Sequence, residues 1–337
     1  MPRLAVFPLK CRGKILENLV ERLEKLSFDY KIQDPYNLEP EVLQTYDIML
    51  IVGTDRDFLE IIHRVGFIGV PIVLISPPGY SSFFSTTSWD GLWEGIEKIS
   101  ERDFTIEDFS TLQIEIDGSK KHYCLNEVAL FADKSGVILD YTLRVDDETV
   151  WRDSGDGLIV STPVGSTGYA LSAGGPIVAR NANVMVIVPV NSLNPMRRPL
   201  IVSDSSTISI SDISCRVATV AIIDGVLREK VKENLVVRKS DKRIRLVRFE
   251  AKLLDSMARK RRIALEIEDS PPSVKFIYKM LETYGSLTMR ELVELTNLPP
   301  RTVRYALKIL VEKGVVERLT SLRDARVSIY RLKSRIH

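Results

Sequence analysis

Residues 156–178 read DGLIVSTPVGSTGYALSAGGPIV, and this segment combines glycines and hydroxyl side chains with one aromatic residue and almost no charge. Tyr169 offers an aromatic face, and Asp156 can accept a hydrogen bond from a ligand hydroxyl. Glycine has no side chain and therefore permits close approach of a ligand to the backbone. The segment contains glycine at four positions, Gly165, Gly168, Gly174 and Gly175. The segment therefore predicts a ligand pocket lined by backbone.

The chain before this segment alternates short apolar strand patterns with amphipathic helical patterns. The strand patterns are residues 4–8, 47–53 and 70–76, and the helical patterns are residues 15–26 and 58–65. Continuous apolar strands joined by helices predict a parallel sheet that is covered on both faces. Residues 1–112 are therefore predicted to form an α/β domain that binds ligands at the carboxyl ends of its strands.

Residues 113–247 are rich in Val, Ile and Thr and contain many short strand patterns joined by turn residues, which predicts a β-sandwich or a similar all-β unit around the glycine-rich segment. Residues 246–260 have a helical pattern that runs into the basic cluster 259–262. Pro271 and Pro272 then mark a linker, so residues 248–272 are predicted to be a basic helix followed by a linker.

The last part of the chain, residues 273–337, is predicted to form three helices and a β-hairpin. Thr288 and Glu291 form a capping-box signature at the start of the second helix, and Pro300 favours the start of the third. This pattern resembles a winged helix-turn-helix. In such a module the third helix enters the major groove and the wing lies along the DNA backbone. The candidate DNA-binding residues are Arg301, Thr302, Arg304, Tyr305 and Lys308 on the helix, and Arg323 and Arg326 on the wing.

Charge is unevenly distributed along the 337 residues, although the formal net charge is only +2. Residues 1–227 contain 20 Lys and Arg against 31 Asp and Glu, whereas residues 273–337 contain 13 against 6. A basic C-terminal part on an acidic body predicts a polyanion partner for that part, and together with the winged-helix pattern it indicates double-stranded DNA. The alternatives for this part are a solvated basic surface and a dimerisation module.

The three cysteines and three histidines are scattered, which argues against a disulfide framework and against a zinc or iron site. Any metal would be a hard ion such as Mg²⁺, held by carboxylates and phosphate. The N-terminal residues lack a signal-peptide pattern and the sequence has no long apolar run, so a cytoplasmic protein without a membrane partner is expected.

With these elements in place, the segment 156–178 closely resembles the long signature of NAD kinases. Asn126 and Glu127 are similar to that family's asparagine-glutamate motif, and residues 189–204 and 223–225 fit its later segments. The resemblance extends over about residues 1–255. It implies an α/β domain on the ATP side and an all-β domain that binds NAD, here followed by a small winged helix-turn-helix domain. The implied reaction is phosphoryl transfer to the 2′-hydroxyl of the adenosine ribose.

The resemblance also implies the roles of individual residues in the dinucleotide site. Asn126, Glu127 and Thr167 would contact the adenosine half of NAD or NADP. The rest of the pocket would be lined by Asp156, Gly168, Tyr169 and Ser172. Asp55 would be the catalytic residue that assists the 2′-hydroxyl and the metal.

The ATP loop departs from the family pattern, which is Gly-Gly-Asp-Gly-Thr. The corresponding residues here are Gly53, Thr54, Asp55, Arg56 and Asp57, so Asp55 is retained and two glycines are lost. Arg56 adds bulk where backbone N–H groups would cradle phosphates, and a carboxylate at Asp57 repels phosphate unless a cation bridges the two. Val164 also replaces the usual hydroxyl residue. Because phosphoryl transfer depends on positioning and electrostatics, these changes threaten catalysis more than dinucleotide binding.

Two hypotheses follow. In the first, the protein is a transcriptional regulator that senses NAD(P) or a related adenosine nucleotide and adjusts the DNA affinity of its winged helix. In the second, it is an active ATP-dependent NAD kinase, with ATP and Mg²⁺ as cofactors, and an appended DNA-binding domain. A kinase for another hydroxylated substrate is a third possibility. Homo-oligomerisation is expected in either main case.

Overall fold

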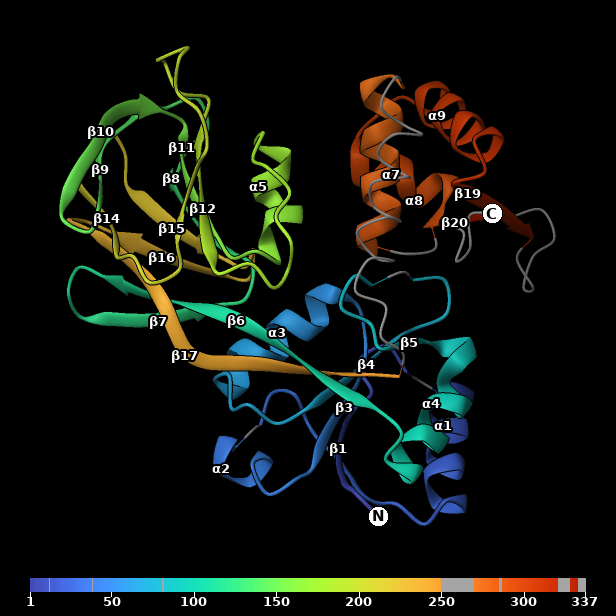
Figure 1. Cartoon of the computed structure of the whole chain (residues 1–337). Coiled ribbons are helices and arrows are strands. Elements are labelled where there is room, and N and C mark those ends of the chain that lie inside the picture. The colour runs from blue at the N-terminus through green and yellow to red at the C-terminus, as the bar shows by residue number, and fades with distance from the viewer. Residues whose placement is uncertain are drawn as a thin grey trace.

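The computed structural model describes residues 1–11, 13–37, 39–80, 82–249, 270–284, 287–320 and 328–332. Figure 1 shows an α/β unit at the bottom, a β-rich unit at the upper left and a helical unit with a small sheet at the upper right. Within the described ranges, no helix is both long enough and apolar enough to span a membrane.

The N-terminal unit is the predicted parallel sheet. Strands β2, β1, β3 and β4 lie in that order and all pair in parallel. The elements are β1 (Arg3–Phe7), α1 (Lys14–Lys25), β2 (Asp29–Ile32), α2 (Pro40–Leu43), β3 (Ile48–Val52), α3 (Asp55–Val65), β4 (Ile72–Ser76), β5 (Thr87–Ser88), the 3-10 turn η1 (Trp89–Gly91) and α4 (Leu92–Glu101).

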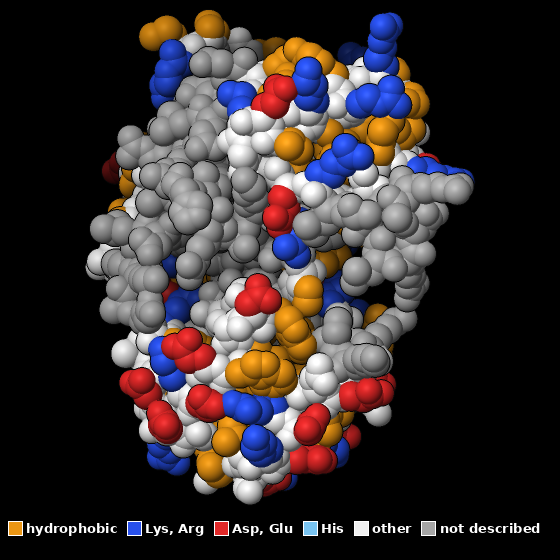
Figure 2. Space-filling view, turned by 90° about the vertical axis from the view of Figure 1, so that its right-hand side faces the viewer, with side chains coloured by type: hydrophobic (Ala, Val, Ile, Leu, Met, Phe, Trp, Pro, Cys, Tyr) orange, Lys and Arg blue, Asp and Glu red, His pale blue; other side chains and the backbone are white. Residues whose placement is uncertain are grey.

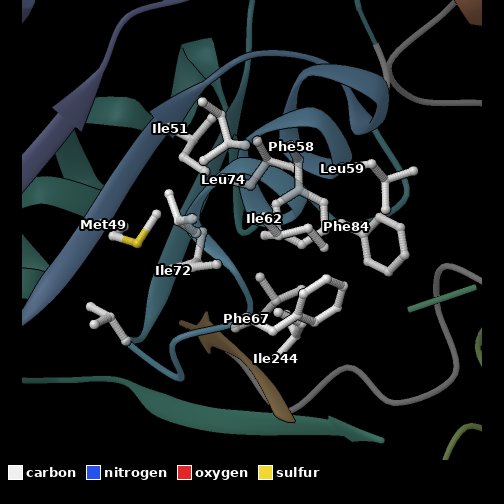
Figure 3. Packing of buried hydrophobic residues seen from close by; sticks show 14 of the residues in the cluster. Met49, Ile51, Phe58, Leu59, Ile62, Phe67, Ile72, Leu74, Phe84 and Ile244 are labelled. Atoms are coloured by element: carbon white, nitrogen blue, oxygen red, sulfur yellow. The ribbon is translucent and has the colours of Figure 1, made fainter. Parts of the chain in front are cut away.

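Both faces of this sheet are covered, because β3 and β4 are buried along their whole length. Met49 and Ile51 pack on one side in a cluster with Phe58 and Ile62 of α3, whereas Leu50 and its neighbours pack on the other side. Figure 3 shows the first cluster, in which Phe58 and Ile62 lie against the strand side chains and Phe84 closes one end. The sheet thus places the N-terminus of α3 directly after the carboxyl end of β3.

The β-rich unit consists of two sheets that enclose a hydrophobic core, as the strand patterns predicted. One sheet has the order β13-β12-β11-β8-β15-β16, and the opposite sheet contains β10-β9-β14-β17 with β6 and β7. The elements are β6 (Thr105–Ile116), β7 (Lys120–Cys124), β8 (Glu127–Ala132), β9 (Leu139–Val145), β10 (Glu148–Gly155), β11 (Gly157–Ser161), the 3-10 turn η2 (Gly165–Thr167), α5 (Tyr169–Ser172), β12 (Val184–Val190), β13 (Leu200–Ser203), β14 (Ile208–Cys215), β15 (Thr219–Ile223), β16 (Leu227–Val231) and β17 (Leu235–Arg248).

Two long strands, β6 and β17, run from one unit into the other (Figure 1). β17 pairs with β14 of the sandwich near its start and with Ile72 of β4 through Leu246 near its end. The domain boundary expected after residue 112 therefore falls inside β6. The α/β and β-rich units share one continuous sheet.

The helix expected over residues 246–260 is wrong at its start, because residues 246–248 are the end of β17. Leu246 and Val247 are both fully buried, and they belong to the clusters on opposite faces of the α/β sheet. Adjacent apolar residues that face both sides are typical of a central strand, and a short apolar run does not distinguish such a strand from a buried helix. The remainder of that expected helix, with the basic cluster 259–262, lies outside the described residues.

The C-terminal unit has the predicted winged-helix pattern and its own hydrophobic core. Thr288 caps α8 as expected: its backbone N–H donates to Glu291 Oε2 over 2.7 Å, and its hydroxyl accepts the N–H of Glu291 over 3.2 Å. The sheet order is β18-β20-β19. The elements are α7 (Pro272–Tyr284), β18 (Leu287–Thr288), α8 (Met289–Thr296), α9 (Pro300–Glu312), β19 (Val316–Thr320) and β20 (Ser328–Leu332).

Candidate functional site

The glycine-rich segment contains strand β11, the turn η2 and the short helix α5, and it ends at Val178. Thr162 ties its first turn to the strand that carries the asparagine-glutamate motif. The Thr162 N–H donates to the carbonyl of Asn126 over 2.8 Å, and the Thr162 hydroxyl donates to the carbonyl of Leu125 over 2.6 Å. Two motifs that are distant in sequence thus share one backbone network.

Gly165 brings these motifs into direct contact. A Cβ atom at this position would lie 2.1 Å from the carbonyl oxygen of Asn126 and 2.4 Å from its carbonyl carbon. No side chain fits there, since both neighbouring atoms belong to the backbone. The glycine is required because the signature turn packs on the backbone of Asn126.

Glu127, Gly168 and Tyr169 meet on the next part of the turn. The Cβ position of Gly168 is 3.2 Å from Oε2 of Glu127, and Glu127 is only 8% exposed. The Tyr169 ring stacks on Phe131 with a centroid distance of 5.8 Å and stays 43% exposed. Burial raises the pKa of the Tyr169 hydroxyl, and the negative charges of Glu127 and Asp156 raise it further. One aromatic face and two carboxylates therefore surround this turn.

The other residues expected to line the dinucleotide site belong to the glycine-rich segment itself. Asp156 accepts a hydrogen bond from Nδ2 of Asn191 over 2.7 Å, which fixes its carboxylate at the start of the signature. Thr167 donates its hydroxyl to the carbonyl of Val164 over 3.2 Å, and Ser172 is exposed at the end of α5. Such hydroxyls, carboxylates and open glycines fit the ribose and amide groups of a dinucleotide.

The side chain of Val164 packs in the hydrophobic core. It is 4% exposed and belongs to the hydrophobic cluster of the α/β unit, together with Phe58 and Phe84. Its apolar side chain therefore stabilises the contact between the two units.

Asp224 orients the asparagine-glutamate motif, a role that was not predicted. Its fully buried carboxylate accepts the backbone N–H groups of Leu125, Asn126 and Glu127 over 2.8, 2.7 and 3.2 Å. His63 of α3 lies 2.8 Å away through Nε2. The sequence carried one signal for this residue, since residues 223–225 match a later family segment, but nothing pointed to His63.

The N-terminus of α3 is closed by the side chains of its own first turn. Thr54 is the N-cap, and Asp57 Oδ2 accepts the Thr54 N–H over 2.8 Å and the Thr54 hydroxyl over 2.7 Å. Lys10 lies 3.7 Å from the other oxygen of Asp57. A Cβ at Gly53 would lie 2.8 Å from the Cβ of Asp57, so Gly53 is needed for this tight turn.

Asp55 is the first residue of α3, and both of its carboxylate oxygens accept backbone hydrogen bonds. The N–H of Phe83 donates to Oδ2 over 2.7 Å, and the N–H of Phe84 donates to Oδ1 over 2.9 Å. Within the described ranges, no group of three or more His, Cys, Asp and Glu side chains is arranged to hold a metal ion.

The winged helix presents the expected residues of its third helix to solvent. Arg301, Arg304, Tyr305 and Lys308 are exposed, whereas Thr302 is half-buried. Arg323 and Arg326 lie outside the described residues. In Figure 2 the upper end, which the winged helix occupies, shows more Lys and Arg than Asp and Glu, whereas the lower end over the α/β unit carries both signs.

Comparisons with known proteins agree with this geometry. Residues 125–249 match the family model described as the ATP-NAD kinase C-terminal domain, and residues 276–317 match a model described as winged helix-turn-helix DNA-binding. The NAD kinase of Methanosphaera stadtmanae is 33% identical over 216 residues, which cover 64% of this chain and 78% of that protein. The NAD kinase of Methanopyrus kandleri is 31% identical over 206 residues, which cover 60% of this chain and 73% of that protein.

Two solved structures have a similar fold. An NAD kinase from Archaeoglobus fulgidus in complex with ATP has a TM-score of 0.66 at 25% identity, over 78% of this chain and 99% of that chain. Yeast NADH kinase complexed with NADH has a TM-score of 0.64 at 18% identity, over 80% of this chain and 88% of that chain. The second likeness concerns the fold alone.

Proposed function

Because the chain belongs to the NAD kinase family and also carries a winged helix-turn-helix domain, we propose that it is a transcriptional regulator. The retained dinucleotide site would sense NAD(P) or a related adenosine nucleotide. Occupation of this site would then change the affinity of the winged helix for double-stranded DNA.

One contrast between the two halves of the site carries this proposal. The dinucleotide half is assembled, since Gly165 packs on Asn126 and Asp224 orients the turn that holds Glu127. The ATP half is closed, since the N-terminus of α3 is capped by Thr54 and Asp57. A helix N-terminus binds phosphate through free N–H groups and its positive dipole end. Here a carboxylate takes that position and would repel a triphosphate.

The winged helix supplies the other half of the proposal. Exposed arginine, lysine and tyrosine side chains on α9 can reach phosphates and base edges when the helix lies in a major groove. A regulator of this kind commonly reads two half-sites as a dimer. Exposed apolar residues on the β-rich unit, including Leu193 at 64% and Met196 at 77%, support a homo-oligomer.

Ligand titration tests the proposal directly. Added NAD(H) or NADP(H) should stabilise the native protein, by about 2.7 kcal/mol when the free ligand reaches about 100 times its Kd. The same ligand should change the affinity for a DNA duplex selected from a random library on the wild-type protein. Thermal unfolding and fluorescence anisotropy measure the two effects. Unchanged stability and unchanged DNA affinity with all four nucleotides would overturn the proposal.

An active ATP-dependent NAD kinase is the alternative function. The observation in its favour is Asp55, which is retained at the start of α3 and would assist the ribose 2′-hydroxyl if Phe83 and Phe84 released it. ATP and Mg²⁺ would then be its cofactors.

A kinase assay separates the two functions. With ATP and Mg²⁺, we expect NADP formation at least about 10³-fold below the 1–100 s⁻¹ that is typical of kinases, because the closed loop repels the triphosphate. Other triphosphates and polyphosphate should give the same result. Rapid NADP formation that the substitution Asp55→Asn abolishes would instead establish the kinase.

The substitution Arg304→Ala should weaken DNA binding about tenfold or more. Loss of an arginine contact to a base costs about 1–3 kcal/mol, and loss of a contact to phosphate reduces the slope of log affinity against log salt concentration by about one. Arg290→Ala is the matched control, because Arg290 is exposed on α8 and pairs with Glu294 of the same helix over 3.0 Å. Anisotropy titrations at several salt concentrations measure both effects. Equal DNA affinity in the two variants would remove α9 from the DNA interface.

A further inference from the structure

We propose that the segment of residues 82–86, here called the junction loop, couples the dinucleotide site to the winged helix. This inference rests on the proposed function and names the element through which ligand binding would reach the DNA-binding domain. The two ends of the junction loop are anchored to β4, since the N–H of Ser82 donates to Oγ of Ser76 over 3.3 Å and the N–H of Thr86 donates to the carbonyl of Leu74 over 2.7 Å. Between these ends the loop contacts three further parts of the chain. These are the start of α3, Arg180 just beyond the glycine-rich segment, and the end of β17.

The first contact is Asp55, which holds the loop by its backbone. Its two carboxylate oxygens accept the N–H groups of Phe83 and Phe84 over 2.7 and 2.9 Å. Phe84 is also 3% exposed and packs on Phe58 of α3 with a centroid distance of 5.1 Å, as the close view shows (Figure 3). The loop is therefore tied to α3 both by hydrogen bonds and by packing.

The second contact is Arg248, the last residue of β17. Its Nη1 donates to the carbonyls of Phe84 and Ser85, both over 3.0 Å, and its Nε donates to Oε2 of Glu107 over 2.7 Å. The next residue, Phe249, packs on α4, where a Cβ at Gly95 would lie 2.8 Å from its ring. Arg248 and Phe249 are the last described residues before the winged helix. The base of the connection to that domain is thus fixed on the junction loop.

The third contact is Arg180, two residues beyond the glycine-rich segment. Its guanidinium lies 4.6 Å from the centroid of the Phe83 ring, and its Nη1 is 3.6 Å from Oε1 of Glu107. The side chain is 8% exposed, and a nearly buried guanidinium needs charged partners to remain stable there. Glu107 pairs with both Arg180 and Arg248, so the chain just beyond the glycine-rich segment and the end of β17 share one carboxylate.

These contacts divide the junction loop between two sides. The N–H groups of Phe83 and Phe84 donate to Asp55, and the carbonyls of Phe84 and Ser85 accept from Arg248, so a shift of the middle of the loop toward one side strains the hydrogen bonds on the other. The family resemblance implies that Asp55 would assist the ribose 2′-hydroxyl of a bound NAD. A bound NAD that donates this hydroxyl to Asp55 would compete with the amides of Phe83 and Phe84. Two alternative hydrogen-bonding states of one loop are the kind of element that couples distant sites.

The substitution Arg248→Met tests the coupling, because methionine keeps much of the volume but donates no hydrogen bond. Arg245→Met is the matched control, since Arg245 lies on the same strand and pairs with Asp108 over 3.5 Å. In the full chain, NAD affinity is measured by calorimetry. DNA affinity, with and without saturating NAD, is measured on the duplex selected with the wild-type protein. Couplings between sites typically amount to about 5–150-fold.

We expect the NAD affinity of Arg248→Met to lie within about twofold of that of the wild type. The ratio of its DNA affinities with and without NAD should fall to about one. Arg245→Met should keep the wild-type effect. Glu107→Gln, which keeps the shape but removes the shared charge, should also reduce the effect and serves if Arg248→Met does not fold. If the wild type responds to none of the four nucleotides NAD(H) and NADP(H), the proposed function fails. If NAD changes the DNA affinity of the wild type, and changes that of Arg248→Met and of Glu107→Gln to the same extent, only the role of the junction loop is overturned.

Discussion

Replacing Asp224 with alanine is expected to abolish dinucleotide binding and to lower the free energy of unfolding by about 3–5 kcal/mol. The buried carboxylate accepts the N–H groups of Leu125, Asn126 and Glu127 and pairs with His63. Without this carboxylate, three buried backbone N–H groups lose their acceptor, and water does not readily replace it in a buried site. The turn that presents Asn126 and Glu127 would then relax, and the adenosine contacts would be lost.

Urea unfolding and NAD calorimetry measure the two effects, and two control variants separate them. Asp133→Ala removes a carboxylate that is 47% exposed and pairs with Arg228 over 3.4 Å, so it should change stability by at most about 1 kcal/mol. Asp224→Asn keeps one acceptor oxygen and should give an intermediate loss of both stability and affinity. Wild-type NAD affinity in a folded Asp224→Ala protein would show that the asparagine-glutamate turn does not bind the ligand.

The sequence was sufficient where the signal is local. The capping box at Thr288 and Glu291 and the helix start at Pro300 were predicted and confirmed, because helix caps depend on residues within one turn. The alternation of apolar strands and helices predicted the parallel sheet, because both faces of β3 and β4 are buried. Helix α4 was missed, although Leu92, Ile96 and Ile99 recur at helical spacing.

The sequence was not sufficient where distant residues meet. His63 and Asp224 are 161 residues apart, and no local pattern links them. The hydrogen bonds from the backbone of Phe83 and Phe84 to Asp55 could not be predicted either, because the junction loop has no periodic pattern and every residue other than proline carries a backbone N–H. The end of β17 was assigned to a helix because Leu246 and Val247 fit either structure until their neighbours are known. Long-range hydrogen bonds, rather than propensity, determine these features.

The substitution Gly165→Ala is expected to lower the affinity for NAD by at least about 100-fold, which corresponds to about 2.7 kcal/mol. The added Cβ would lie 2.1 Å from the carbonyl oxygen of Asn126, a distance at which one backbone segment must move. Asn126 is anchored by Asp224, so we expect the signature turn to move instead and to displace Tyr169 and Gly168. Overpacking of this kind costs about 1–3 kcal/mol in stability, and occasionally more.

Calorimetry gives the NAD affinity of the Gly165→Ala protein, and urea unfolding shows whether the loss exceeds what instability alone produces. Gly118→Ala is the control, because Gly118 has a φ of +66° in the turn after β6 and a Cβ there meets nothing within 4 Å. It should lose about 1 kcal/mol of stability from backbone strain while NAD affinity stays unchanged. Equal NAD affinity in the two variants would mean that NAD binds elsewhere, since displacement of the signature turn must weaken the binding of a ligand that contacts it. A selective loss in Gly165→Ala would locate the ligand against the backbone where residues 126 and 165 meet.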